Sequence, residues 1–403
     1  MTCLTLVAMA VAAATSPRAI LRAPGIRRTY GTSLIARLPM GAHGLVLLLF
    51  VHQLTGSYAL GGAASGAFAL SMAVSSPPLG RLIDRHGQTP VLVPLAFAQG
   101  AVHLALATAP SDTPAALLLA GAVGTGLLLP PMSAAARALW SDLLDRAVLP
   151  AAYALEAAVL EAVYIVGPLL IVGVVAAFSL RLALIVDGAC VLVGTLWFAS
   201  SRQSRRWRGA PGVERHWSGP LTSPAVRVLL VAVGLFGVAI GAMEIGVVAV
   251  ANAAGTPSAA GAVLAASGAG SLIGGLLAGR FRPTERPGRR FAWLFLALTV
   301  GMVPWALAPT PFWLGVAVFI GSIPLAPALA TSSAMIGEFA PTGTVTEAFT
   351  WNGTSLAGGL AIGSAATGAL AHGAPHTPLA LAAAVMLLAT LWVALRDARG
   401  AFG

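Results

Sequence analysis

Runs of about 20 consecutive apolar residues recur along the whole chain, and they constrain its fold more than any other feature. An α-helix of that length spans roughly 30 Å of hydrocarbon, whereas the strands of a membrane barrel appear as weakly alternating segments of about 10 residues. Only 9% of the 403 residues are charged, against roughly 25% in soluble proteins. The chain is therefore predicted to be an all-α integral membrane protein.

Twelve membrane-spanning helices account for the apolar runs. They are predicted at 31–55, 60–82, 89–108, 114–135, 151–176, 181–200, 226–250, 257–279, 290–308, 311–335, 347–370 and 377–395. Residues 1–17 hold a short apolar run with no positive charge before it, so we interpret them as an interfacial segment or an overlong start rather than a signal peptide.

The positions of the arginines support an even number of spans. All 23 basic residues are arginine, and all but Arg37 and Arg181 fall in segments on one side of the predicted membrane. The positive-inside rule assigns that side to the cytoplasm. We therefore expect a multi-pass protein of a bacterial cytoplasmic membrane, with both termini in the cytoplasm.

The longest polar stretch divides the chain into two halves of six helices. It contains several arginines, glycines and prolines, as a flexible linker does. The halves are also weakly related, since Gly275 to Arg280 align with Gly80 to Arg85 at a shift of 195 positions, about half the chain. The predicted parts are an N-terminal arm (1–30), a six-helix bundle (31–200), a basic linker (201–225), a second bundle (226–395) and a tail (396–403).

A short charged loop joins the second and third spans. Gly80, Leu82, Asp84, Arg85 and Gly87 stand there in the order Gly-x-Leu-x-Asp-Arg-x-Gly. This loop resembles the one between helices 2 and 3 of the major facilitator superfamily, although Gln88 and Thr89 replace two basic positions of the family pattern.

The resemblance covers roughly residues 30–396 through the topology, the linker and this loop. It implies two pseudo-symmetric six-helix bundles that rock around a central site. In the family the loop holds one conformation by charge contacts with neighbouring helices. Gly80, Asp84, Arg85 and Gly87 are therefore expected to form a gating loop, with Arg137 or Arg146 as the partner of Asp84.

Glu161 is the leading candidate for a proton-coupling residue. It lies about 15 Å into the fifth predicted span, where an ionisable side chain is costly unless it has a function or a partner. A structural acid bonded to an arginine or a hydroxyl is the alternative. Glu156, roughly 140° away around the same helix, is a second candidate and could instead belong to a cytoplasmic gate.

Gly167 and Pro168 resemble part of the fifth-helix motif of antiporters in that superfamily. Ala158, Ile171 and Val172 stand where the motif has further glycines. The partial match favours export over import.

Three further polar residues in the predicted spans are candidates for contacts with substrate. Arg37 could bind an anion, could pair with Glu156 or Glu161, or could reach the headgroups. Glu244 lies in the outer part of the seventh span, and Asn352 in the eleventh; each could contact substrate or simply pack.

Other polar and small residues in the spans receive structural roles. Asp187 is expected to pair with Arg181 or water, and His43, His52 and His103 are treated as single histidines on apolar helices. Glycines spaced four apart predict close helix packing in the eighth and eleventh spans. These are Gly270, Gly274, Gly275 and Gly279, then Gly359 and Gly363.

The function that we predict is proton-coupled export of a small molecule by a monomeric secondary transporter in the lipid bilayer. Without lysine the chain has no nucleotide-binding P-loop, and it lacks His-Glu-x-x-His and Gly-x-Ser-x-Gly motifs, so we expect no enzyme, no cofactor, no metal and no nucleic-acid partner. Uptake or facilitated diffusion of a sugar or other nutrient is the main alternative, and a non-transporting membrane sensor is a remote one.

Overall fold

The computed structural model describes residues 26–145, 148–209, 217–278, 286–368 and 374–402. These residues form helices and connecting turns, with no β-strand among them. The first 25 residues of the arm, Arg146, Arg215, Gly279, Arg280 and Arg282 lie outside the described residues, so the predictions made for them are not addressed here.

The helices follow the predicted order of spans. Their bounds are α3 Ile26–Arg37, η1 Leu38–Gly41, α4 His43–Thr55, α5 Tyr58–His86, α6 Gln88–Ala107, α7 Ala115–Leu127, α8 Met132–Leu143, α9 Leu149–Ala177, α10 Leu180–Ala199, α11 Arg202–Arg206, η2 Gly219–Thr222, α12 Pro224–Ala253, α13 Ala259–Ala278, α14 Pro287–Leu307, α15 Pro311–Gly321, α16 Leu325–Phe339, α17 Val345–Gly368 and α18 Thr377–Ala398.

Ten helices of the described part of the chain are long and apolar enough to cross a membrane, and the bent pair Ile26–Gly41 and His43–Thr55 makes eleven. The remaining predicted span corresponds to α17, which is a helix of 24 residues but is not among these eleven. Its first turns bury Thr346, Glu347, Thr350 and Asn352 against other helices. These polar side chains lower its hydropathy although its length suits a span.

Three of the predicted spans are interrupted by irregular backbone at a proline. The first bends by 45° at η1, which contains Pro39. The fourth is divided into α7 and α8 at Pro130 and Pro131, and the tenth into α15 and α16 at Pro324. Proline has no N–H to donate and its ring clashes with the preceding turn, which explains why the helices end there.

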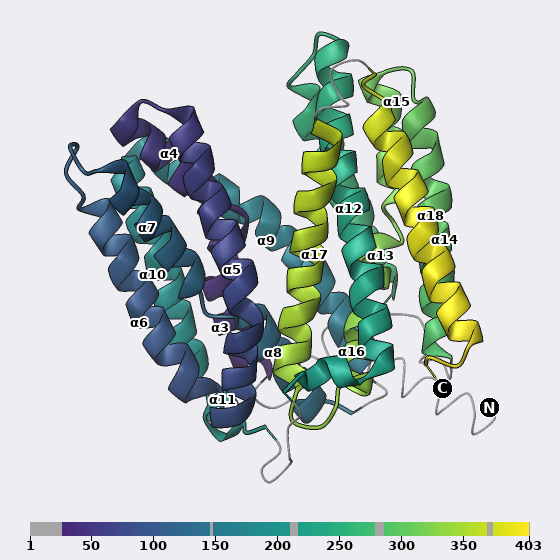
Figure 1. Cartoon of the computed structure of the whole chain (residues 1–403), viewed down its shortest axis with the longest axis horizontal. Helices are drawn as coiled ribbons and strands as arrows, with labels where there is room; N and C mark the ends of the chain where they lie inside the picture. Colours follow the sequence, from purple (N-terminus) through teal and green to yellow (C-terminus); the bar gives the residue numbers. More distant parts are fainter. Residues whose placement is uncertain (1–25, 146–147, 210–216, 279–285, 369–373, 403) are drawn as a thin grey trace.

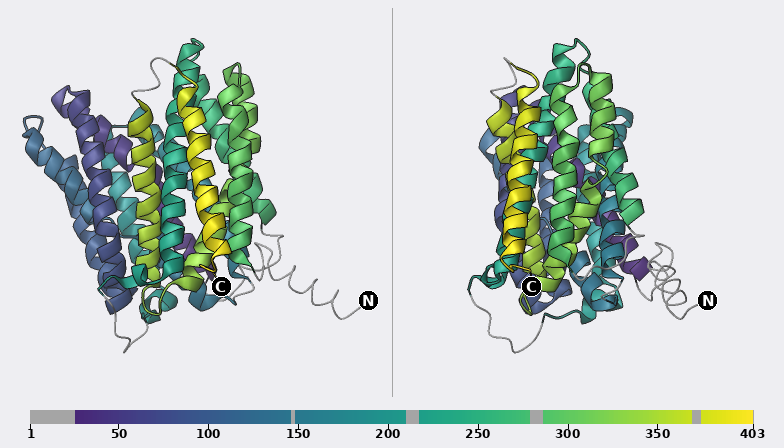
Figure 2. Two further views of the ribbon diagram at one scale, coloured as in Figure 1. Left: turned by 45° about the vertical axis from the view of Figure 1, so that its right-hand side comes forward. Right: turned by 90° about the vertical axis from the view of Figure 1, so that its right-hand side faces the viewer.

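The helices lie in two groups, which we call the N-group (α3–α10) and the C-group (α12–α18) (Figures 1 and 2). The groups approach one another towards the end that carries α11 and the C-terminus, called the lower end here because it is lowest in Figure 1. One apolar core belongs to the N-group alone, whereas the largest core extends from the C-group to Tyr30, Trp140 and Tyr153 of the N-group. The apolar contact between the groups therefore includes aromatic side chains of the N-group.

The predicted close packing at glycines is confirmed. The Cα atoms of Gly359 and Gly363 on α17 lie against backbone atoms of Gly234 and Val238 on α12, with no room for a side chain. Gly270 and Gly274 on α13 lie in the same way against the carbonyl groups of Phe319 and Ile323. Small residues thus allow backbones to touch within the C-group.

Two neighbouring glycines of α17 allow a direct test of this packing. A methyl group at Gly359 would overlap the Gly234 carbonyl and lie 3.0 Å from the Val238 nitrogen, whereas Gly358 faces open space. We expect Gly359→Ala to destabilise the protein by about 1–3 kcal/mol, because the helices must move apart. Gly358→Ala is the matched control and should leave the thermal unfolding temperature in detergent unchanged or raise it. Equal unfolding temperatures for the two variants would contradict this account.

Candidate functional site

Asp84, at the end of α5, binds the first turn of α17 across the two groups. Its carboxylate accepts hydrogen bonds from the backbone N–H groups of Thr346, at 3.1 Å, and Glu347, at 2.8 Å. The first N–H groups of a helix have no partner within the helix and carry partial positive charge, so a carboxylate is stabilised there. Arg137, which we expected as a partner of Asp84, instead lies beside Glu156.

Arg81 completes this contact with two hydrogen bonds to a single carboxylate. Its Nε and Nη2 donate to the two carboxylate oxygens of Glu347 at 3.0 and 2.6 Å, a paired geometry that fixes both side chains. Neither Arg81 nor Glu347 was predicted as a site residue. Their pairing joins α5 to α17, which are more than 250 positions apart, and so could not be read from local sequence.

The two glycines of the predicted gating loop have clear physical reasons. At Gly80 a side chain would overlap Thr350 and the backbone of Glu347, so only glycine lets α5 approach α17. Gly87 ends α5 with φ +91°, which favours glycine, and lies against Arg208. Arg85 is exposed at this end of α5. The gating role of these residues remains a prediction.

Arg37 and Glu156 form an ion pair that is closed off from solvent, each side chain being 1% exposed. Nη1 of Arg37 donates to Oε1 of Glu156 at 2.5 Å, and Nη2 donates to Oγ of Ser33 at 2.9 Å. Arg137 lies 3.7 Å from the same carboxylate oxygen. Of the alternatives for Arg37, pairing with Glu156 is the one observed.

Glu161 contacts the other group of helices. Oγ of Ser271, on α13, donates to Oε1 of Glu161, on α9, at 3.1 Å. Glu161 is half-buried near the middle of α9, and its partner differs from that of Glu156. A hydroxyl partner is compatible with both the coupling role and the structural role of this acid.

Gly167 and Pro168 on α9 pack against the bend of the first span. Gly167 lies against the carbonyl group of Leu38, and a Cβ at Gly41 would come within 3.2 Å of Pro168 and 3.0 Å of Tyr164. α9 continues as a helix through Pro168 to Ala177. The residues that resemble an antiporter motif therefore support the bend between α3 and α4.

Glu244 and Asn352 lie on the C-group, away from these pairs along the chain. Glu244 is half-buried towards the upper end of α12. Asn352 is 5% exposed on α17, and its Oδ1 has no hydrogen-bond partner within the described residues. Their roles as substrate contacts remain predictions.

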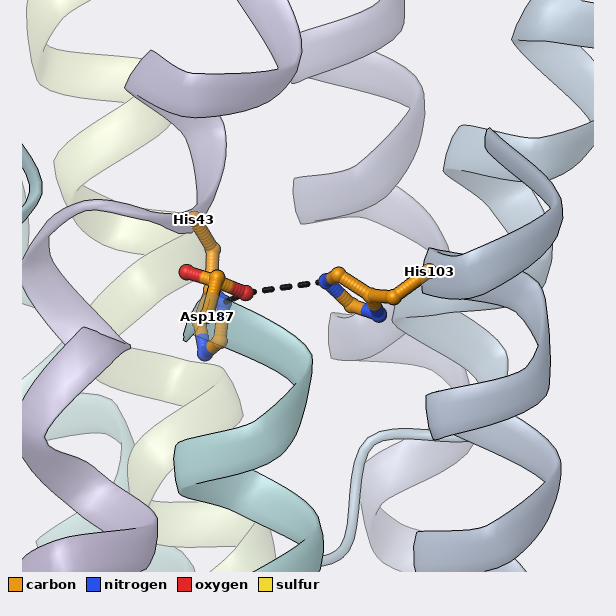
Figure 3. Close-up of side chains that lie close together, drawn as sticks. All are labelled: His43, His103 and Asp187. Carbon is orange, nitrogen blue, oxygen red and sulfur yellow. Dashed lines mark hydrogen bonds and ion pairs between the residues drawn. The ribbon is translucent and has the colours of Figure 1, made fainter. Parts of the chain in front are cut away.

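A buried cluster of two histidines and an aspartate was missed by sequence reasoning (Figure 3). Oδ2 of Asp187 on α10 lies 2.7 Å from Nδ1 of His43 on α4 and 2.9 Å from Nε2 of His103 on α6. The expected Asp187–Arg181 pair is wrong: Arg181 donates to the carbonyl groups of Ala107 and Ala109. An acid within an apolar run was the available signal; its partners depend on how three distant helices pack.

These three side chains are also the described group that could converge on a metal ion. Ligands of a tetrahedral zinc ion, at about 2.0–2.1 Å from it, lie roughly 3.3 Å from one another. The carboxylate oxygen lies 2.7 and 2.9 Å from the two ring nitrogens, which are hydrogen-bond distances. The observed geometry thus fits direct hydrogen bonds better than ligation.

Comparison with known proteins gives a consistent family and fold. A model of the Major Facilitator Superfamily matches residues 29–255. The structure is similar to a bacterial homologue of the iron transporter ferroportin in an outward-facing state, with a TM-score of 0.74, 12% identity and 92% and 98% of the two chains covered. It is also similar to the E. coli fucose:proton symporter FucP, with a TM-score of 0.72, 16% identity and coverage of 93% and 99%.

A third similar structure is the human organic anion transporter MFSD10 (TETRAN). Its TM-score is 0.71 at 14% identity, and the alignment covers 92% of this chain and 100% of that one. Among curated protein sequences the chain has no significant match. At these identities the structural likeness shows the fold, while substrates remain those of the proteins named.

The Arg37–Glu156 pair predicts a measurable pattern of stabilities. Glu156→Gln leaves a buried arginine without its counter-charge, and we expect a loss of about 3–5 kcal/mol. Arg37→Met combined with Glu156→Leu should recover most of this loss, because neither charge then remains buried, and Arg137, 14% exposed, can reach water. Thermal unfolding in detergent measures the effect, with the exposed Glu338→Gln as control. If Glu156→Gln unfolds at the wild-type temperature, the pair contributes no net stability.

Proposed function

Because this chain belongs to the major facilitator superfamily, and is therefore a secondary transporter and not an enzyme, we propose that it exports a small molecule in exchange for protons. The proposed mechanism is alternating access, in which the N-group and the C-group rock against each other in a monomer. The central observation in its support is the contact of Arg81 and Asp84 with the first turn of α17, since it joins the two groups at one end.

The strength of this contact suits a gate. A carboxylate at a helix N-terminus contributes about 0.3–1 kcal/mol, and up to about 2 kcal/mol when partly buried. The Arg81–Glu347 pair, with Arg81 32% exposed, adds about 0.2–1 kcal/mol. A total of a few kcal/mol favours the closed end but can be overcome by substrate or proton binding.

The arginines indicate which side of the membrane is closed. Arg81 and Arg85 lie at the lower end with the arginines of α11, where the linker begins, and with the C-terminus (Figure 1). The positive-inside rule makes this the cytoplasmic side of a bacterial membrane. The structure then corresponds to a state closed towards the cytoplasm, with both termini there.

Glu161 is proposed as the coupling acid because its partner lies on the other group. An ionised carboxylate away from water requires hydrogen-bond donors, and Ser271 supplies one at 3.1 Å. Protonated Glu161 carries no charge and can leave Ser271 at a lower cost. Binding of a proton would thus loosen the link between α9 and α13 and allow the groups to move apart.

The direction of transport is proposed from the fifth predicted span. Gly167 and Pro168, which resemble the antiporter motif, hold α9 against the bend of the first span, where a side chain at position 167 would overlap the Leu38 carbonyl. This packing favours export, while uptake or facilitated diffusion of a sugar or other nutrient remains the alternative function. The two functions differ in the sign of the substrate-dependent proton flux.

Proton flux in liposomes tests this proposal. Wild-type protein is reconstituted and screened against a panel of small molecules, with Glu161→Gln as the test variant and Glu338→Gln as the exposed control. We expect substrate-dependent proton movement in wild type and control, and at least a tenfold loss in Glu161→Gln, because an amide cannot bind the proton. Equal flux in Glu161→Gln would make this acid structural. Substrate transport without proton movement in wild type would replace coupled export by facilitated diffusion.

A further inference from the structure

We propose that His43, Asp187 and His103 form a second proton-binding site, within the N-group, which holds one proton shared between His103 and Asp187. The three side chains come from α4, α10 and α6 and are only 2%, 1% and 2% exposed (Figure 3). The occupancy of the site stands on its own geometry. Its role in coupling rests on the function proposed above.

The count of protons follows from the two contacts of His103. Its Nδ1 lies 3.1 Å from the backbone carbonyl oxygen of Gln99, which can only accept, so Nδ1 carries a hydrogen. A neutral imidazole has one N–H, and Nε2 would then present a lone pair to the carboxylate 2.9 Å away. Two acceptors at that distance repel each other. A further proton must lie between them, either on Nε2 or on the oxygen of Asp187.

His43 occupies the remaining position on the same oxygen. Its Nδ1, 2.7 Å from Oδ2 of Asp187, donates a hydrogen bond, and its Nε2 has no partner among the described residues. Neutral His43 with its hydrogen on Nδ1 satisfies this arrangement. The cluster is then uncharged as a whole, in either position of the shared proton.

Net charge explains why this proton is held. Loss of the proton leaves a single negative charge among side chains that are at most 2% exposed, and an uncompensated buried charge is costly. It also turns the His103–Asp187 contact from attraction to repulsion. The proton leaves from Nε2 or from the carboxyl oxygen to water, and α6 then loses its bond to α10, whereas His43 keeps its own.

Few other ionisable groups face the cluster. Phe68 of α5 packs against the ring of His43, and α7 has no charged residue. On α10, Cys190 is near enough to interact with the charge of Asp187, and Arg181 is bound to backbone carbonyl groups. Nearby elements carry other ionisable side chains with partners of their own or at a distance along the helix, namely Arg37 of α3, Glu156, Glu161 and Tyr164 of α9, and His52 and Tyr58, which stack on each other.

The site is placed to influence the bend of the first span. His43 is the first residue of α4, directly after η1, while Arg37 before η1 is bound to Glu156. The bend therefore has an ionisable contact on each side. Gly188 fits the cluster closely, since a Cβ there would lie 2.7 Å from that of His103. A change of protonation at His103 alters the contact that holds α6 to α10 beside this bend.

Solid-state ¹⁵N NMR of histidine-labelled protein in lipid bilayers tests the proton count. Near pH 7 we expect one histidine with both ring nitrogens protonated, or with one protonated nitrogen and a second in a strong hydrogen bond to a protonated carboxyl group. This signal should vanish in His103→Gln. It should become that of an ordinary neutral histidine in Asp187→Asn and be unchanged in His52→Gln, which is the matched control. A proton on neither Nε2 of His103 nor Asp187, or a bound metal in its place, would overturn the proposal.

Proton flux in the same variants separates this inference from the proposed function. If the signal is present and Asp187→Asn transports with proton flux reduced at least threefold relative to substrate flux, the site takes part in coupling. If the signal is present but wild type shows no coupled flux, the proton site stands and proton-coupled export fails. If the signal is absent while Glu161→Gln abolishes coupling, the function stands and this site fails. His103→Gln tests the site again should Asp187→Asn fail to fold.

Discussion

Hydrocarbon offers no hydrogen-bond partner, and the arrangement of this protein depends on that constraint. Each buried ionisable side chain in the spans must find its partner inside the protein. Glu156 finds Arg37, Asp187 finds two histidines, and Asp84 finds the free N–H groups at the start of α17. In each case the partner lies on a different helix. The same polar groups that are costly in a membrane therefore determine which helices lie together.

The bend of the first span is where several of these contacts meet. Pro39 ends the regular helix, Gly41 lets α9 approach, and Gly167 leaves room for the carbonyl of Leu38. Arg37 is held by Glu156 on one side of the bend, and His43 by Asp187 on the other. A rigid α9 and α10 thus support a first span that is irregular at its middle. Such irregular backbone within a membrane is tolerated where protein surrounds it.

The sequence was most informative where a property is local. The length of the apolar runs predicted the all-helical membrane fold, and the loop at Gly80 indicated the family that the comparisons show. Opposite charges in one apolar environment also suggested that Arg37 pairs with Glu156. The prolines at positions 39, 130 and 324 were visible, but whether proline bends a span or passes within it, as Pro168 does in α9, depends on tertiary packing.

Contacts between distant helices were not predictable in this way. The expected partners of Asp84 and Asp187 were arginines close in the predicted topology, whereas the structure provides backbone amides and histidines from remote segments. Glu347 was not considered because its own helix, α17, looked like an ordinary span. A single sequence contains no information on which faces of two helices meet, and the site residues depend on those faces.

A balance between weak contacts at the lower end and a change of shape at the upper end is the central claim for this transporter. Distances between spin labels test it, with Cys3 and Cys190 replaced by serine and pairs placed at the exposed positions His86 and Glu338 below and Ser111 and Asn252 above. Loss of about 1 kcal/mol in Asp84→Asn should change the populations about fivefold. The lower distance should lengthen and the upper one shorten together. If Asp84→Asn leaves both distributions as in wild type, the contact between α5 and α17 is not a gate and the account is wrong.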